Sequence, residues 1–371
     1  MNRGSPAGPT LDPVPSSPAP VAAVGGVVAS ELIDVTTDPS ALDSTGFWVV
    51  MLPFEGAPLC ARFARRRPMT GKPARRWLGP SPDAWVSSLD KDGFCERVEL
   101  IRESIAAGDV YQVNLTRRLS APLPDDADIL ALGSALAGGN PSPHAAVLRL
   151  PDHGIHVASA SPERFLQREG RVVISQPIKG TAATPDGFLD KDRAENVMIV
   201  DLVRNDLGRV CEWGSIEVPD LCAVEAHPGL NHLVSTIRGR LRPAMGWAEL
   251  LGATFPPGSV TGAPKLAALE LINRLETVPR GPYCGAIGWV DADRRRGDLN
   301  VAIRTFWFEG GQVHLGTGGG ITWGSDPLGE WEETELKTSR LLRVASNQPV
   351  TTHQPVTTHQ PVTTTGGRLL R

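Results

Sequence analysis

Two pairs of acidic residues, each pair spaced three positions apart, could together hold a metal ion. Asp192 and Glu195 form the first pair, and Glu330 and Glu333 form the second. In an α-helix this spacing places both side chains of a pair on one face. Carboxylate oxygens brought from two helices suit a hard divalent cation such as Mg²⁺. Taken alone, either pair is more often a solvated helix face, because acidic side chains are usually exposed.

Lys179 and Glu163 each follow a segment with the composition of a β-strand, and each could take part in catalysis. Lys179 lies between Ile178 and Gly180. An amine that is removed from water near the end of a sheet loses basicity and becomes a nucleophile, although a solvated surface lysine is the commoner case. Glu163 could be a positioned acid or a loop charge. His232 could be a hydrogen-bond donor or an ordinary core histidine.

Two glycine-containing segments could bind an anion through their backbone amides. Residues 258–265, Gly-Ser-Val-Thr-Gly-Ala-Pro-Lys, precede a predicted helix. A helix start presents free N–H groups to an anion, and a plain loop-to-helix junction is the alternative. Residues 316–322 contain three consecutive glycines after a predicted strand, which allow close approach to an anion or form a tight turn that leads to the second acidic pair. Neither spacing matches a Walker A loop or a dinucleotide-binding fingerprint.

A mixture of strands and helices must position these residues. Runs of β-forming residues bounded by Gly, Pro or Asp predict strands over Phe47–Phe54, Ala145–Leu150, Gly154–Ala158, Arg171–Ser175, Ala286–Asp291, Val301–Phe308 and Gln312–Gly316. Apolar residues at helical spacing predict helices over Gly93–Ala107, Asp190–Asp206, Pro264–Leu275 and Pro327–Ala345. Because the strands occur in adjacent groups rather than singly between helices, the pattern favours an α+β layered domain over a doubly wound parallel sheet.

The composition is typical of a globular protein in a reducing compartment. Of the 371 residues, 41% are apolar and 21% are charged, which excludes global disorder. The net charge of -4 argues against a nucleic-acid partner. The five cysteines are widely spaced and include no Cys-x-x-Cys pair, which argues against a disulfide framework or a zinc site. No apolar run is long enough to span a membrane, and we expect a cytoplasmic protein without a membrane partner.

The two ends of the chain differ from its middle. Residues 1–27 form a proline-rich lead that is expected to be disordered. In residues 346–371 the sequence Gln-Pro-Val-Thr-Thr recurs every six residues with almost no apolar content, and we expect a low-complexity tail. The ordered body is therefore expected to span residues 28–345.

Taken together, these segments resemble the chorismate-utilising enzymes, the family of anthranilate, aminodeoxychorismate, isochorismate and salicylate synthases. The resemblance runs from about Ile101 to Arg340 and rests on motifs in the same order: Gly108–Leu115, Ser161–Glu163, Pro177–Thr181, Glu195–Asp206, His232–Val234, Gly258–Lys265, Tyr283–Gly285, Ile303–Arg304, Gly316–Gly320 and Glu330–Thr334. It implies an α+β domain in which helices cover two packed antiparallel sheets, with chorismate bound between them and Mg²⁺ as the cofactor.

The resemblance also implies roles for individual residues. Glu195 and Glu333 would bind the metal, and Asp192 and Glu330 would lie close to it through water. Glu163 would be the general acid that protonates the departing 4-hydroxyl of chorismate. The substrate contacts that the resemblance implies are Gln112, Thr181, His232, Ser259, Tyr283, Arg304, Gly318, Gly319, Gly320 and Lys337.

Two positions divide the family by chemistry. Isochorismate and salicylate synthases carry a water-activating lysine where this chain has Gln112, so the resemblance favours ammonia as the nucleophile. Anthranilate synthases usually carry alanine where this chain has Lys179, whereas aminodeoxychorismate synthases carry lysine, with an implied attack on C2 of the ring. The resemblance thus implies an aminodeoxychorismate synthase subunit that makes 4-amino-4-deoxychorismate for 4-aminobenzoate and folate synthesis. Anthranilate synthase component I and a non-catalytic chorismate-binding relative are the alternatives.

Ammonia is expected to come from a separate glutamine amidotransferase subunit in a heterodimer. None of the cysteines lies in a glycine-flanked strand–turn–helix elbow of the kind that presents a glutaminase nucleophile. Two departures from the family pattern stand out. Ala182-Ala183-Thr184 replace the common Pro-Arg-Gly. The N-terminal part, residues 28–92, is shorter than in members where this region helps to form a tryptophan pocket.

Overall fold

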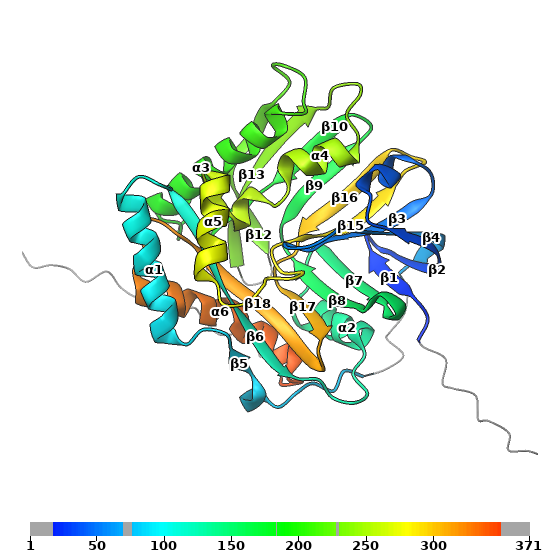
Figure 1. The fold of residues 1–371 in the computed structure, drawn as a ribbon, viewed down its shortest axis with the longest axis horizontal. Coiled ribbons are helices and arrows are strands. Elements are labelled where there is room, and N and C mark those ends of the chain that lie inside the picture. Colours follow the sequence, from blue (N-terminus) through cyan, green and yellow to red (C-terminus); the bar gives the residue numbers. More distant parts are fainter. Residues whose placement is uncertain (1–17, 70–75, 183, 228–229, 350–371) are drawn as a thin grey trace, which may run out of the picture.

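The strands form one continuous antiparallel sheet that folds so that its two halves share a core (Figure 1). The computed structural model describes residues 18–69, 76–182, 184–227 and 230–349. The α-helices within them are α1 (Lys91–Ala106), α2 (Ile129–Gly139), α3 (Asp190–Gly208), α4 (Trp247–Thr254), α5 (Lys265–Leu275) and α6 (Pro327–Ala345).

Each neighbouring pair of strands in the sheet is antiparallel. In the order of their hydrogen bonding, the strands are β12 (Glu217–His227), β13 (Leu230–Arg240), β10 (Val172–Gln176), β9 (Arg164–Glu169), β16 (Arg296–Val301), β15 (Ala286–Asp291), β3 (Phe47–Leu52), β4 (Leu59–Pro68), β2 (Val27–Thr36), β1 (Val21–Val24), β7 (His144–Leu150), β8 (Ile155–Ser161), β17 (Thr305–Glu309), β18 (Gln312–Ile321) and β6 (Gln112–Pro122). The short strands β5 (Val86–Ser87) and β14 (Gly262–Ala263) pair with β6, and β11 (Ile178–Ala182) pairs with β13.

Helices cover the sheet in three groups. The helices α3 and α4 contribute to the main core with β3, β9, β15 and β16. The helices α2 and α6 pack against β6, β8, β17 and β18. The helices α1 and α5 pack on β6 through a third cluster of apolar side chains. Because burial of this apolar surface is the main driving force for folding, these clusters fix where α3 and α6 lie on the sheet.

The helix α6 shows how local sequence sets an element that carries candidate site residues. The side chain of Asp326 accepts a hydrogen bond from the backbone N–H of Gly329, and Pro327 occupies the first turn, where its missing N–H costs nothing. The buried stripe of the helix includes Glu330, Thr334, Thr338 and Leu341, at the spacing of one helix face. The acidic end of α6 is therefore held against the sheet.

The expected α+β class with antiparallel sheets is confirmed, and the two expected sheets are the halves of a single hydrogen-bonded ladder. The predicted bounds of β15 and α6 agree with the structure. The predicted strand Val301–Phe308 is wrong as one element, because β16 ends at Val301 and β17 begins at Thr305. Arg304 lies between them with a φ of 50°, a left-handed conformation that no strand maintains.

Two further expectations need correction. Residues 316–320 do not form a tight turn, because they lie within β18 and pair with Asn114–Arg118 of β6. The disordered lead does not extend to residue 27, because β1 spans Val21–Val24 and β2 starts at Val27. Residues 1–17 of the expected lead and 350–371 of the expected tail lie outside the described residues.

All five cysteines are free thiols. None of the helices in the described part of the chain combines the length and the apolar character needed to cross a bilayer.

Candidate functional site

Lys179 meets Gln112 at the end of β18, beside Gly320. A methyl group at Gly320 would lie 1.9 Å from Nε2 of Gln112 and 3.3 Å from Nζ of Lys179. Only glycine leaves room for both side chains there. Gln112 is 1% exposed, and its Oε1 has no hydrogen-bond partner among the described residues. A buried acceptor without a partner is costly, so this atom is available to a donor on a bound ligand.

The backbone around Lys179 is irregular in a way that directs its side chain. The register of β11 against β13 shifts between Lys179 and Thr181, opposite Leu233 and His232. The intervening Gly180 has a φ of 77°, which glycine adopts without strain. This bulge presents Lys179, and its Nζ donates a hydrogen bond to the carbonyl oxygen of Ser259 at 3.1 Å. Bulges commonly redirect a side chain next to a functional site.

Burial lowers the pKa of Lys179, although the nearby carboxylates of Glu195 and Glu163 act in the opposite direction. Removal from water disfavours the charged amine and so enlarges its neutral, nucleophilic fraction. The commoner of the two roles considered from the sequence, a solvated surface lysine, does not fit these surroundings.

Glu163 is a buried acid next to Lys179. Glu163 is 4% exposed to solvent. Burial raises the pKa of Glu163 to about 7, while hydrogen bonds from the Ser259 side chain and the Ile178 backbone, together with the charge of Lys179, limit the rise. A carboxyl group with this pKa carries a proton for part of the time at neutral pH and can donate it. Lys179, Glu163, Ser259 and Gln112 are called the catalytic cluster below.

Two carboxylates on α3 and two on α6 form the acidic cluster, which consists of Asp192, Glu195, Glu330 and Glu333. Burial raises the pKa of Glu195, and the charges of Glu333 and Asp192 raise it further. Burial also raises the pKa of Glu330, whose carboxylate accepts a hydrogen bond from the Ser325 hydroxyl at 2.6 Å. Like charges raise each other's pKa only at short range, so Glu195 of α3 and Glu333 of α6 lie near each other.

Lysines partly neutralise the acidic cluster. Lys337 forms an ion pair with Glu333 at 2.7 Å and donates to the carbonyl oxygen of Gly318 at 3.0 Å. Lys337 is the main cause that lowers the pKa of Glu333. Gly319 adjoins Glu330 and Lys337, since a methyl group there would lie 3.1 Å from Glu330 Oε2 and 3.8 Å from Lys337 Nζ. Lys337, Gly318 and Gly319 therefore lie next to the acidic residues of α6.

The donor set of the acidic cluster fits a magnesium ion. Its ligands would be carboxylate oxygens, the type that Mg²⁺ prefers, and their mutual repulsion would be relieved by a cation. Among the described residues, no three acidic, histidine or cysteine side chains already lie close enough to enclose an ion. Asp192 has a structural role as well, because its carboxylate accepts from the backbone N–H of Leu189 at 2.8 Å. Glu195 accepts no such local bond among the described residues, whereas Glu333 is already paired with Lys337.

Among the described residues, Arg304 and Tyr283 form no hydrogen bond or ion pair with the catalytic or the acidic cluster. Burial lowers the pKa of Arg304, with a contribution from Arg340, and Arg304 pairs with no carboxylate in the part of the chain that the structure describes. A desolvated, unpaired guanidinium attracts an anion. Tyr283 packs against Gly316 instead, where an added methyl group would lie 2.1 Å from its ring. His232 is buried and pairs through its backbone with Thr181.

The segment Gly258–Lys265 is a loop-to-helix junction, one of its two predicted roles. Lys265 Nζ contacts Asp206 Oδ2 at 2.5 Å and donates to the carbonyl oxygens of Thr254 and Pro256 at 3.0 Å each. The amine therefore faces the protein rather than an anion. By fixing both ends of this loop, Lys265 places Ser259 next to Glu163 and Lys179.

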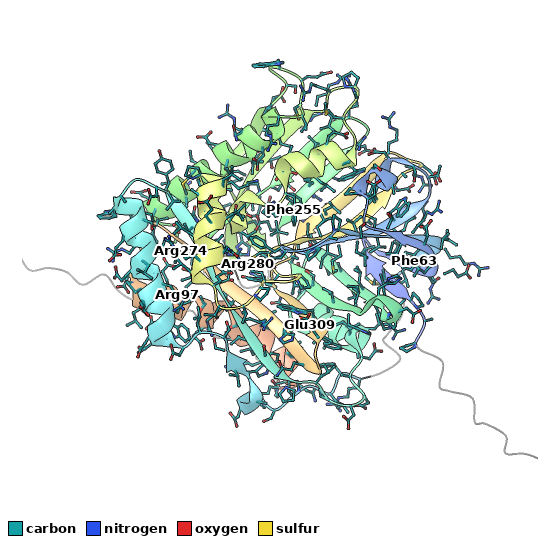
Figure 2. All side chains as sticks on the ribbon, in the orientation of Figure 1. Phe63, Arg97, Phe255, Arg274, Arg280 and Glu309 are labelled. Carbon is teal, nitrogen blue, oxygen red and sulfur yellow. The ribbon has the colours of Figure 1, made fainter. Side chains whose placement is uncertain are left out.

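Two polar residues that sequence analysis did not single out also hold the site together. Arg280, labelled near the centre of the molecule in Figure 2, is buried and donates to the carbonyl oxygens of Val260 and Asn114 at 2.7 Å each. It thereby ties the loop of Ser259 to β6. Its ion-pair partner Glu276 follows the end of α5 and is not helical, so no helical spacing in the sequence indicated this role. Asn196 donates to the carbonyl oxygen of Leu233 at 3.1 Å and so joins α3 to β13.

Comparison with known proteins places the chain in a family. A family model described as chorismate binding enzyme matches residues 69–343. The chain is 42% identical over 301 residues to anthranilate synthase component 1 of Streptomyces coelicolor, covering 77% of this chain and 57% of that protein. It is 40% identical over 276 residues to aminodeoxychorismate synthase component 1 of Salmonella typhimurium, covering 71% of this chain and 60% of that protein. The chain thus spans less than two thirds of these relatives.

Solved structures agree on the fold. Anthranilate synthase component I from Streptococcus pneumoniae superposes with a TM-score of 0.71 at 23% identity, covering 92% of this chain and 95% of that one. The menaquinone-specific isochorismate synthase of Escherichia coli superposes with a TM-score of 0.74 at 20% identity, covering 88% of each chain. With the matched family model and relatives of at least 40% identity, this chain belongs to the family of chorismate binding enzymes.

Proposed function

We propose that this chain is the subunit of an aminodeoxychorismate synthase that converts chorismate and ammonia to 4-amino-4-deoxychorismate and water. The observation that carries the proposal is the buried amine of Lys179, whose Nζ lies 3.1 Å from the carbonyl oxygen of Ser259 and next to Glu163. A nucleophile and a proton donor in one cluster are the two groups that this displacement requires. Aminodeoxychorismate synthase component 1 of Escherichia coli is 40% identical over 273 residues.

In the proposed reaction, the neutral Nζ of Lys179 attacks C2 of the ring. The ring double bonds shift, the C4–O bond breaks, and the 4-hydroxyl leaves as water with the proton of Glu163. The adduct nitrogen then releases a proton, which restores Glu163. Ammonia attacks C4, the double bonds shift back, and the C2–N bond breaks. A proton from the former ammonia goes to the departing Nζ, so both residues return to their starting state.

Two groups of residues would hold the substrate in place, one at Arg304 and one at the acidic cluster. Arg304, without an acidic partner among the described residues, would attract the carboxylate of the pyruvyl group together with the amides of Gly318–Gly320. Glu195 and Glu333 would hold Mg²⁺, with Asp192 and Glu330 nearby, and the ion would offset the repulsion between these carboxylates and a carboxylate of chorismate. Gln112 Oε1, which has no hydrogen-bond donor within the described part of the chain, would accept a hydrogen bond from the substrate or from ammonia.

A separate glutaminase subunit would supply the ammonia. Burial raises the pKa of Cys60 and Cys284 to about 12 and that of Cys211 to about 11, and a protonated thiol is a poor nucleophile. This supports a heterodimer in which the partner hydrolyses glutamine. Glutamine alone should support no turnover by the purified chain, while an ammonium salt should do so increasingly as pH rises toward 9, because only ammonia attacks carbon.

The test is to identify the product. The chain is incubated with chorismate, MgCl₂ and an ammonium salt at alkaline pH, and aminodeoxychorismate lyase is then added. Formation of 4-aminobenzoate that depends on the lyase is the expected result. Anthranilate formed without the lyase would overturn the proposal, as would chorismate that remains unchanged.

Anthranilate synthesis is the second candidate, since the Streptomyces coelicolor relative with that name is 42% identical. Lys179 separates the two, because direct amination at C2 needs that carbon free for ammonia, whereas the proposed route occupies C2 with the enzyme. If the chain is an anthranilate synthase, Lys179→Ala should retain or increase anthranilate formation.

A further inference from the structure

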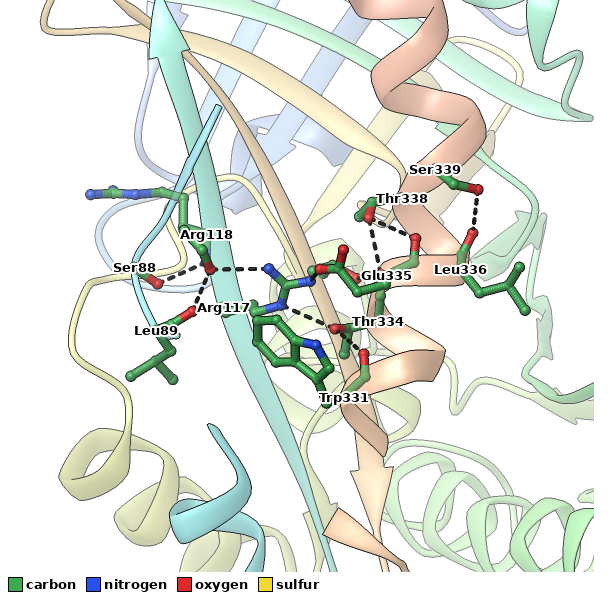
Figure 3. Close-up of polar contacts among 12 residues, drawn as sticks. Ser88, Leu89, Arg117, Arg118, Trp331, Thr334, Glu335, Leu336, Thr338 and Ser339 are labelled. Atoms are coloured by element: carbon green, nitrogen blue, oxygen red, sulfur yellow. Dashed lines mark hydrogen bonds and ion pairs between the residues drawn. The ribbon is translucent and has the colours of Figure 1, made fainter. Parts of the chain in front are cut away.

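Arg117 of β6 is a buried cation whose contacts converge on one side of α6. The residue is 2% exposed and lies on the strand that also carries Gln112. In Figure 3 its guanidinium points from β6 toward α6 and lies over the ring of Trp331, with 4.1 Å between the guanidinium carbon and the ring centroid. A desolvated guanidinium over an indole ring is a favourable and geometrically specific contact.

The guanidinium of Arg117 makes hydrogen bonds to α6 and to β5. Its Nε donates to Thr334 Oγ1 at 3.0 Å and its Nη1 to Ser87 Oγ at 3.0 Å. Its Nη2 bonds to Glu335 on the adjacent position of α6. The planar guanidinium therefore uses all three nitrogens, one on β5 and two on α6, and a point-charge ammonium could not reproduce this arrangement.

The helical positions of these partners relate them to the acidic cluster. Trp331, Thr334 and Glu335 occupy positions i, i+3 and i+4 of α6, and Thr334 lies one turn beyond Glu330 on the buried stripe of the helix. A rotation of α6 by about 20° would move a carboxylate at a radius of about 5–6 Å by about 2 Å. Magnesium coordination tolerates deviations of only about 0.2 Å.

We propose that Arg117 is a positioning residue that sets the rotation of α6 and thereby places the carboxylates of Glu330 and Glu333 opposite α3. The inference rests on the proposed metal site, but not on the identity of the aminated product. Arg117 forms no hydrogen bond or ion pair with Glu330 or Glu333 among the described residues. It acts on their position through its contacts with Trp331, Thr334 and Glu335.

The experiment measures metal binding directly. Mn²⁺ is titrated into the full chain with saturating chorismate and without ammonium, so that no amination occurs, and free Mn²⁺ is followed by its electron paramagnetic resonance signal. Arg117→Lys should weaken Mn²⁺ binding by about tenfold, the lower end of the range for residues that orient metal ligands. Hydrogen–deuterium exchange should increase in residues 327–345.

The matched control is Arg97→Lys. Arg97 lies on α1, and its guanidinium donates to the carbonyl oxygens of Leu275 and Gly93 at 2.7 Å each. Among the described residues, Arg97 makes no hydrogen bond or ion pair with α6, and its variant should bind Mn²⁺ within twofold of the unaltered protein.

A milder variant guards against a failure of Arg117→Lys to fold. Glu335→Ala removes one of the contacts from a half-exposed side chain and should weaken Mn²⁺ binding by a smaller factor. Combined with Arg117→Lys it should add little, because both changes break the same contact. Unchanged Mn²⁺ binding in both Arg117→Lys and Glu335→Ala would overturn the inference, and so would equal weakening by Arg97→Lys. Failure of the proposed amination would be seen separately, as a different product from the unaltered chain.

Discussion

Replacing Glu163 with Gln should make the protein more stable at alkaline pH and nearly inactive. Glu163 is 4% exposed, and burial raises its pKa from an ordinary 4.5 to about 7. The native state therefore holds a proton that the unfolded state has already released. Stability from this group is complete below pH 4.5 and is lost as pH rises through 7. A pKa difference of about 2.5, at about 1.4 kcal/mol for each unit, corresponds to about 3 kcal/mol.

Urea unfolding at pH 4.5 and pH 8 measures this effect as a double difference. Between these pH values, the free energy of unfolding of Glu163→Gln relative to the unaltered chain should rise by about 3 kcal/mol. Because the amide keeps an oxygen that can accept from Ser259, differences in packing cancel between the two pH values. Amination should fall by about 10²–10⁴-fold, because the amide cannot donate a carboxyl proton.

The exposed carboxylate of Glu99 on α1 provides a control. Glu99→Gln should neither abolish amination nor reproduce the pH-dependent gain in stability. The difference in free energy of unfolding between Glu163→Gln and the unaltered chain is compared at pH 4.5 and pH 8. If this difference is the same at both pH values, Glu163 is not a protonated acid in the folded protein. Retention of full activity by Glu163→Gln would likewise refute its role as the general acid.

Three other predictions concern the nucleophile, the metal and the loop that carries Ser259. Lys179→Ala should reduce amination by about 10²–10⁴-fold at a fixed ammonium concentration, and an unaltered rate would refute covalent catalysis. Glu195→Gln and Glu333→Gln should each raise the Mg²⁺ concentration for half-maximal rate by about tenfold or more; if neither changes it, these residues do not bind the metal. Lys265→Met should lower the free energy of unfolding by about 3–5 kcal/mol, because it leaves the buried carboxylate of Asp206 without its partner, and urea denaturation that shows no loss would contradict this.

Sequence patterns predicted best the elements whose ends are set locally. The start of α6 is encoded by Asp326 and Pro327, and its predicted bounds agree with the structure. The helix α2 was missed, since its sequence Ile-Leu-Ala-Leu-Gly-Ser-Ala-Leu-Ala-Gly-Gly is apolar on all sides and rich in glycine, which hides the helical period. The long strand β6 was missed as well, because polar residues such as Asn114 and Arg117 are buried on it.

The site shows the same division between local and long-range information. The acidic pairs were visible in the sequence because both members of a pair lie on one helix. The neighbours of Lys179 were not visible, because its contact with Ser259 joins residues 80 positions apart. The role of residues 316–320 depended on what faces them. The Tyr283 ring lies against Gly316 and the end of the Gln112 side chain lies against Gly320, and neither contact can be inferred from a local sequence pattern.

The central claim is that Lys179 forms a covalent bond to the substrate, and mass spectrometry of the intact protein tests it directly. The chain is incubated with chorismate and MgCl₂ without ammonium or glutamine, so that the adduct has no ammonia to displace it. Covalent attack by Lys179 should produce a mass increase equal to chorismate less one water, located on the peptide that contains Lys179 and absent from Lys179→Ala. A protein that forms 4-amino-4-deoxychorismate at a normal rate when ammonium is added, yet never carries this adduct, would contradict it.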